Sequence, residues 1–348
     1  TRSNFTVPGD IAANTVALTP TGRVYVLSKQ SGNLDVVKVN LDGSDRQVVV
    51  KATGREEVNN TEIYATNDWQ FVVLKARRDG VQAALYLLDT STDKLTDLDT
   101  AAVDFNIAGW HDHQFVYSTY DSKRQPWNPK QQELKVFDAD SGQRTMLLST
   151  AAQGNSYDNY LAQSLAGVFF VGDKLVYGVQ WSGSGPDLSK QFATIQEVSL
   201  PSLTARELRK DKGASLIMSR ATPTAVNVQI TTDKPDSYQY LNGNLTEINM
   251  STEELLRAVP SYIPGPANQY LWDELVDGAS QVYVAEGSLQ TKHVVMPAGE
   301  FHAFGWYGGD YVLLGKNGSE LFIIPTDSTT QTVPQKVVDY HRPPGQGI

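Results

Sequence analysis

The feature that most constrains the fold is a short unit that recurs seven times along the chain. Each unit has a polar turn followed by a β-branched or aromatic run, and these runs begin at Val24, Phe71, Phe115, Leu175, Asn227, Tyr270 and Tyr311. The runs follow one another at intervals of 41 to 60 residues. Four short strands and their turns occupy about that length, which is the size of one propeller blade. The repeat therefore predicts an all-β fold, a seven-bladed β-propeller of four-stranded antiparallel blades, as a single domain over residues 1–348.

The first unit shows the parts of a blade most clearly. Its turns contain Gly, Asn and Asp, which tolerate positive φ or bond to the local backbone. Its four predicted strands are Thr15–Leu18, Val24–Leu27, Leu34–Val39 and Val48–Val50. The predicted blades cover approximately residues 14–53, 61–99, 103–150, 163–210, 214–249, 258–297 and 300–340. One helix is expected, at Ser251–Arg257, where Ser251 and Glu254 form a capping-box pattern.

Other all-β arrangements remain open at this point. Two stacked β-sandwiches would also explain many short strands, although seven similar units without a linker favour radial repetition. Six or eight blades are alternatives, because the fifth and sixth units are degenerate. Ring closure is open as well: Phe5–Val7 either adds an outer strand to the last blade or covers the seam.

Composition narrows the function classes. The absence of cysteine excludes disulfides, thiolate catalysis and cysteine–zinc sites. A net charge of −10 argues against nucleic acid or an anionic membrane surface as the main partner. No apolar run reaches the roughly 20 residues of a membrane helix, so we expect no membrane insertion by this domain. No signal peptide is visible, and because the chain begins at Thr1 without Met, we expect a processed form that has lost an anchor or export signal.

Two segments of the first unit resemble a known repeat. The turn and strand PTGRVYVL (20–27) and the turn LDGSDRQVV (41–49) are similar to the repeat of TolB-like propellers, although the other units lack the Pro-x-Gly turn. The segments 41–57, 67–80 and 85–99 more closely resemble propeller ectodomains of bacterial surface proteins that carry PEGA domains. The resemblance implies an extracellular or cell-envelope location, tethered by an N-terminal anchor, and transfers no catalytic residues. The upstream PEGA domain that it implies is not in this sequence.

Three long connections fall in the third and fourth units. They are 121–132 and 182–190, both between second and third strands, and 151–163, between the two blades. In a propeller such connections lie on one face, so we expect them to meet at one rim, where loops on a rigid scaffold bind partners. The alternative is that Trp127 and Trp181 fold back as lids. The candidate binding residues are Tyr120, Asp121, Arg124, Trp127, Tyr157, Asp158, Tyr160, Trp181 and Asp187.

No other motif predicts a catalytic or metal site. His111, Asp112 and His113 are adjacent on a turn and can supply two metal ligands at most, so no metal or cofactor is expected. The segments 42–45 and 138–142 lack the glutamate of a complete calcium loop and are interpreted as turns. There is no G-x-S-x-G elbow, and the five histidines are scattered. A carboxylate pair drawn from Asp121, Asp158 and Asp187 is the remaining catalytic possibility.

These observations favour a cell-surface or extracellular binding or adhesion module. We expect it to be monomeric, without enzymatic activity, and to hold a protein or glycan through the loops of blades three and four. A hydrolase that processes glycan or peptide in the cell envelope is the first alternative. A structural envelope scaffold, in which the long connections are merely variable loops, is the second.

Overall fold

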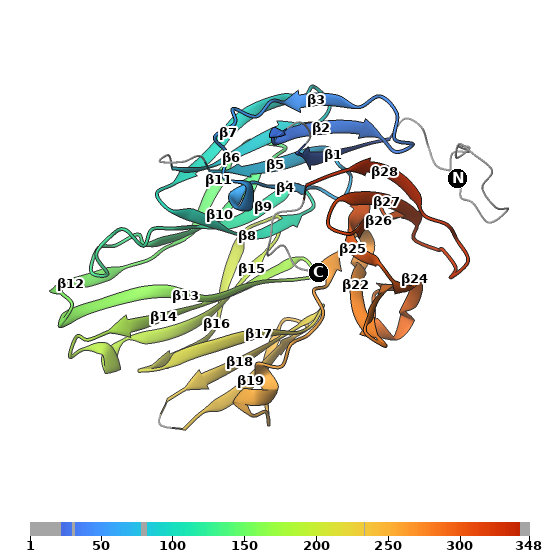
Figure 1. Ribbon diagram of the computed structural model, residues 1–348. Helices are drawn as coiled ribbons and strands as arrows, with labels where there is room; N and C mark the ends of the chain where they lie inside the picture. Colours follow the sequence, from blue (N-terminus) through green and yellow to red (C-terminus); the bar gives the residue numbers. More distant parts are fainter. Residues whose placement is uncertain (1–21, 30–31, 78–81, 233, 342–348) are drawn as a thin grey trace. The chain divides into compact units, whose positions relative to one another are not determined.

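The computed structural model describes residues 22–29, 32–77, 82–232 and 234–341, and most regular elements in them are β-strands. The strands form seven antiparallel sheets, each built from one continuous stretch of chain (Figure 1). These sheets are blades one to seven in chain order. Across the described ranges, no helix has the length and apolar character needed to cross a bilayer.

The blades differ in strand number at two places. Blade one has three described strands: β1 (Arg23–Ser28), β2 (Asp35–Asn40) and β3 (Gln47–Val50). Blade four has five: β12 (Ala152–Ser156), β13 (Asn159–Val171), β14 (Lys174–Gly183), β15 (Phe192–Ser199) and β16 (Thr204–Lys212).

The other five blades have four strands each. Blade two has β4 (Glu62–Ala65), β5 (Phe71–Ala76), β6 (Ala83–Asp89) and β7 (Lys94–Ala101). Blade three has β8 (Asp104–His111), β9 (Gln114–Tyr120), β10 (Gln132–Asp138) and β11 (Arg144–Ser149). Blade five has β17 (Ser215–Thr222), β18 (Ala225–Thr231), β19 (Asp236–Leu241) and β20 (Asn244–Ile248). Blade six has β21 (Ile263–Pro264), β22 (Gln269–Val276), β23 (Ala279–Glu286) and β24 (His293–Gly299). Blade seven has β25 (Phe301–Tyr307), β26 (Tyr311–Lys316), β27 (Glu320–Pro325) and β28 (Gln335–Asp339).

The seven apolar runs of the repeat all lie in strands, as predicted. They occupy β1, β5, β9, β14, β18, β22 and β26, and each of these strands contains at least four consecutive buried residues. The expected helix is present as one turn, α1 (Thr252–Leu255), with the Ser251–Glu254 capping box formed. The predicted strand Thr15–Leu18 and the closure segment Phe5–Val7 lie outside the described residues.

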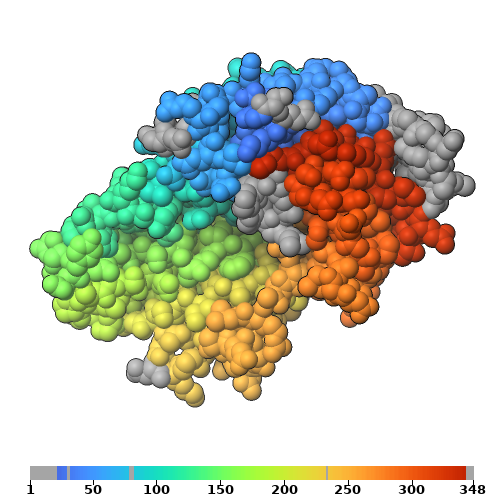
Figure 2. Space-filling model, in the orientation of Figure 1, coloured from blue at the N-terminus to red at the C-terminus, as the bar shows by residue number. Residues whose placement is uncertain are grey.

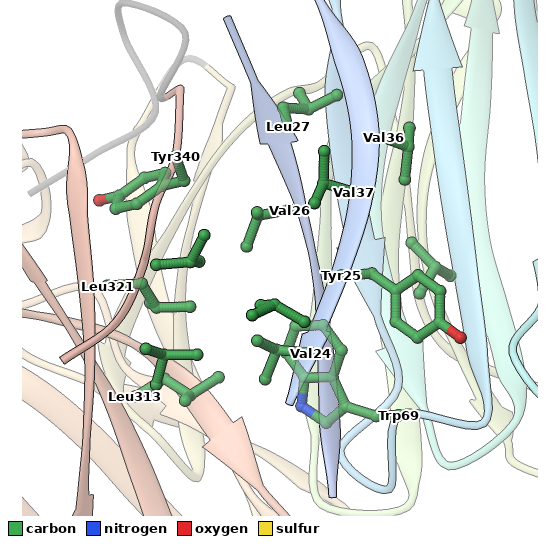
Figure 3. Packing of buried hydrophobic residues seen from close by; sticks show 14 of the residues in the cluster. Val24, Tyr25, Val26, Leu27, Val36, Val37, Trp69, Leu313, Leu321 and Tyr340 are labelled. Atoms are coloured by element: carbon green, nitrogen blue, oxygen red, sulfur yellow. The ribbon is translucent and has the colours of Figure 1, made fainter. Parts of the chain in front are cut away.

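The chain packs as two compact units. Unit one contains Thr1–Thr100 and Pro260–Ile348, and therefore blades one, two, six and seven. Its largest core includes Val24 and Val26 of blade one, Leu313 and Leu321 of blade seven, and Trp69 of blade two (Figure 3). Since these side chains come from three sheets, burying them joins the sheets into one body.

Unit two spans Ala101–Val259 and holds blades three, four and five. One apolar cluster lies between blades three and four, and another between blades four and five. Two glutamine side chains also link neighbouring sheets. The Gln132 side-chain oxygen accepts a hydrogen bond from Leu165 N at 3.0 Å, and that of Gln180 accepts one from Leu216 N at 2.7 Å. Blades three and four are thus held in a fixed relation, and both carry the long connections.

Candidate binding site

The three long segments of blades three and four meet around one tyrosine. Tyr157 occupies the turn between β12 and β13, and its hydroxyl donates a hydrogen bond of 2.9 Å to Gln125 Oε1. Its ring meets that of Trp127 edge-on, with centroids 5.2 Å apart at an interplanar angle of 77°. Its backbone carbonyl accepts a hydrogen bond of 2.7 Å from Ser184 Oγ. Tyr157 therefore contacts both β9–β10 and β14–β15 connections, and we call this assembly the loop platform.

The segment expected to be an irregular connection at 151–163 is instead a β-hairpin. β12 pairs with the first residues of β13, and this adds a fifth strand at the edge of blade four (Figure 1). The prediction failed because Gly154, Asn155 and Ser156 are turn-forming residues, so the segment lacks an apolar alternation. Backbone pairing with an existing strand stabilises it instead.

Two glycines allow the hairpin to form beside the third segment. Gly154 has a φ of +113° and Gly183 a φ of +143°, where side chains are disfavoured. A Cβ atom on Gly183 would lie 2.2 Å from the carbonyl oxygen of Tyr160. That carbonyl accepts hydrogen bonds from Ser184 N at 3.0 Å and Gly185 N at 2.9 Å. The backbone of the β14–β15 connection is therefore fixed to β13.

The β9–β10 connection is braced by its own side chains. Arg124 Nε lies 2.8 Å from Asp121 Oδ2, and Arg124 also donates a hydrogen bond of 3.0 Å to the carbonyl of Pro129. The Gln131 side-chain amide donates to the carbonyls of Gln125 and Asn128. These hydrogen bonds satisfy backbone carbonyl groups of the connection, so the segment that carries Trp127 is ordered.

The predicted binding residues divide into those within the platform and those beside it. The rings of Trp127 and Tyr157 are in contact. This is the aromatic ring contact found among the predicted binding residues that the structure describes. Tyr120 ends β9 with 40% of its surface exposed, and Asp158 is exposed in the hairpin turn. Tyr160 supplies its carbonyl, as described above. Trp181 belongs to β14 and is half-buried opposite Gln163, so it is a strand residue and not part of a loop.

Charged side chains of the platform pair with residues that are close in sequence. Asp187 Oδ1 lies 2.6 Å from Lys190 Nζ, and this hydrogen bond raises the pKa of Lys190. Asp121 is engaged by Arg124 in the same way. Both pairs are local, three residues apart in sequence, and the Lys190–Asp187 pair is exposed at both ends, so it contributes little stability. Two of the three candidate carboxylates, Asp121 and Asp187, are therefore paired with a basic side chain.

Of the two histidines at the β8–β9 turn, His113 is paired with a carboxylate and His111 is stacked on an aromatic ring. Asp112 has a φ of +48° in the β8–β9 turn, and His113 Nδ1 lies 2.8 Å from Asp140 Oδ1. The His111 ring stacks on Phe170 at 6.4 Å. Within the described part of the chain, no three His, Cys, Asp or Glu side chains are grouped as metal ligands.

Sequence reasoning missed the residues that hold the platform together. Gln125 and Ser184 fix Tyr157, and Gly154 and Gly183 allow the close strand approach. The nearest sequence signal was the pair of glycines in SGSG (182–185), which indicated a loop and gave no partner for it.

Comparison with known proteins identifies the fold. Neither a protein-family model nor a curated protein sequence matches the chain. The propeller domain of the Trilobed protease from Pyrococcus furiosus is similar over 92% of this chain and 95% of its own, at 13% identity and a TM-score of 0.50. A prolyl endopeptidase is similar over 93% of this chain at 12% identity and a TM-score of 0.50. This chain spans 50% of that endopeptidase. The seven sheets and these similarities confirm the predicted seven-bladed β-propeller.

Proposed function

We propose that the chain is a binding propeller that holds a partner on the loop platform of blades three and four. One observation carries this proposal: Tyr157 is bonded to Gln125 and Ser184 and packed on Trp127, yet 67% of its surface is exposed. An exposed aromatic ring that is already ordered loses little conformational entropy on binding. Rings of this kind are typical anchors of protein interfaces.

The geometry of the aromatic pair favours a protein partner over a glycan. Trp127 and Tyr157 meet edge-on, so the two rings do not form one flat surface on which a sugar ring could lie. Neighbouring exposed groups, including Asp158 and the Lys190–Asp187 pair, supply the polar rim that protein interfaces have. In Figure 2 the chain around β12 lies in the green region of the surface.

The place of action that we propose is the bacterial cell surface. The support is the resemblance of segments 41–57, 67–80 and 85–99 to surface propeller ectodomains with an N-terminal anchor. Digestion of intact cells with an added protease tests it. We expect the propeller to be removed from living cells while a cytoplasmic marker stays intact; protection of the propeller would contradict this location.

The binding role predicts a loss of function without unfolding. Replacing Trp127 and Tyr157 together by alanine should lower retention of the purified chain on intact cells of its source bacterium by about tenfold or more. Because neither side chain belongs to a fully buried core, the cost in stability should be about 1 kcal/mol. Retention and the melting temperature are measured on the same samples.

A matched control separates this effect from a general loss of surface hydrophobicity. Leu275 lies on β22 of blade six and is 77% exposed, so Leu275→Ala removes apolar surface far from the platform in sequence. We expect its retention to equal that of the unchanged chain. Equal retention by the double variant, or a large fall in its melting temperature with binding intact, would contradict the proposal.

A hydrolytic function is the second candidate, favoured by the similarity to a prolyl endopeptidase of which the chain spans half. On this view the propeller acts as part of a peptidase assembly. Incubation with fluorogenic peptides that contain proline distinguishes the two. We expect the purified chain to give no turnover. The hydrolase would be favoured by peptide turnover that co-purifies with the chain and is lost in Asp121→Asn or Asp158→Asn. A purely structural scaffold predicts neither turnover nor retention on cells.

A further inference from the structure

A cavity of about 250 Å³ lies between blades three and four, close to the root of the β9–β10 connection. Its walls come from β8, β9 and β10 on one side and β13 on the other, all within unit two. Gln132, where the connection enters β10, lines it. The cavity is therefore on the same two blades as the loop platform but uses different residues.

Two β-bulges create this space. The ladder between β8 and β9 shifts between Ile107 and Gly109, and that between β13 and β14 shifts between Leu165 and Gly167. Bulges bend a strand and redirect its side chains. Ala108 stands at the first bulge and packs against the cluster between the two blades, where its short side chain leaves the volume open.

Part of the cavity lining is polar and uncharged. Asn106 and Ser118 are cross-strand partners, and both line the cavity together with Gln132. Ser118 is only 5% exposed, and it lines the cavity from β9. The Gln132 side-chain oxygen is engaged by Leu165 N, which leaves its NH₂ group to donate. Hydroxyl and carboxamide groups both donate and accept hydrogen bonds, so this part of the lining is suited to a ligand that supplies donors and acceptors.

The rest of the lining is mainly aliphatic. Ile107 and Leu134 contribute to it from blade three, and Leu165 and Val168 from blade four; no lining residue carries a charge. Sites for drug-sized ligands have about 300–1,000 Å³, so this volume suits something smaller. A ligand that fits must be uncharged, have an aliphatic face, and offer both donors and acceptors on its other edge.

We propose that the cavity takes one aliphatic residue of a bound polypeptide, whose backbone amide bonds to Asn106, Ser118 and Gln132. A peptide unit offers one N–H and one C=O, which match a hydroxyl and two carboxamides. A sugar is a poorer fit because the one aromatic lining residue, Tyr117, is fully buried and presents no face for stacking. This inference rests on the proposed function for the class of ligand, and it adds the specificity for an uncharged residue.

N-acetyl-leucinamide is the probe for a test on the whole purified chain. We expect saturable binding in ligand-observed NMR, and weaker binding of N-acetyl-glutamate amide, whose charge the cavity cannot solvate. Ser118→Ala and Asn106→Ala should each weaken binding of the leucine probe by about fivefold, the effect of one lost hydrogen bond. Ser118→Leu should fill the cavity and weaken it by about tenfold or more.

The controls separate this proposal from the loop platform and from misfolding. Ser122 is an exposed serine of the adjoining connection, and Ser122→Leu should leave binding unchanged. Asn106 is exposed, so Asn106→Ala remains informative if Ser118→Leu fails to fold. The double variant of Trp127 and Tyr157 should lose cell retention yet still bind the probe, which distinguishes failure of one proposal from failure of the other. Any of three results would overturn the proposal. These are the absence of saturable binding, binding that the Ser118 and Asn106 variants leave unchanged, and better competition by N-acetylglucosamine than by the peptide.

Discussion

Replacing Trp272 by alanine is expected to lower the free energy of unfolding by about 3–5 kcal/mol, the usual cost of emptying a large buried aromatic site. Trp272 lies in β22 of blade six and is 1% exposed. Its ring stacks on Tyr283 with centroids 5.7 Å apart and meets Tyr262 edge-on at 5.3 Å. Its indole nitrogen donates a hydrogen bond of 2.9 Å to Glu274. Substitution would remove all of these contacts and leave a cavity that the rigid sheet cannot close.

Urea unfolding followed by circular dichroism measures this effect, and one residue of the same strand provides the control. Leu275 is 77% exposed, so Leu275→Ala should change the free energy of unfolding by no more than about 0.5 kcal/mol. Trp272→Phe keeps a ring but loses the indole donor and part of the packing, and it should fall between the two. If the two units unfold in separate transitions, the one that contains blade six should shift. Equal midpoints for Trp272→Ala and Leu275→Ala would contradict the packing described for blade six.

The strands could be predicted from the sequence because their burial leaves a pattern in it. The run beginning at Val24 is buried through Leu27, so nearly every residue must be apolar, and a turn rich in Pro and Gly precedes it. The same argument located β5, β9 and β26 correctly. The single expected helix was also found because the capping box of Ser251 and Glu254 is local in sequence. Patterns fixed by neighbouring residues can be interpreted without a structure.

The platform could be predicted only in part because its contacts depend on distant residues. The three long segments and the aromatic side chains of Trp127 and Tyr157 were visible in the sequence. That Tyr157 would bond to Gln125 depends on a hairpin at 152–162, where backbone pairing replaces any apolar alternation. Trp181 was expected at the edge of the connection 182–190, but the strand β14 continues two residues beyond it through polar sequence. The cavity beside Ser118 arises from bulges, which leave no strong local signal.

Gly183→Ala is expected to destabilise the platform strongly, although it adds only one methyl group. The new Cβ would lie 2.2 Å from the carbonyl oxygen of Tyr160, and Gly183 has a φ of +143°, which side chains rarely adopt. Relief requires β13 and β14 to separate where Leu161 pairs with Gly183. Leu161 is 3% exposed, so separation also uncovers a buried apolar side chain. We expect a loss of about 2–4 kcal/mol in local stability.

Hydrogen exchange read by mass spectrometry can localise that loss. Amides at 157–162 and 183–188 should exchange faster in Gly183→Ala, since both segments depend on the bonds to Tyr160, while blade five should be unaffected. Gly172 is the matched control: it lies in the turn at the other end of the same two strands, has a φ of +57°, and a Cβ added there would meet no atom within 4 Å. Gly172→Ala should therefore cost about 1 kcal/mol and leave exchange at the platform unchanged. If the amides of both variants exchange at the same rates, the close contact at Tyr160 is not what orders the platform. If Gly183→Ala loses retention on cells and Gly172→Ala does not, the order of these strands is what presents Tyr157 to its partner.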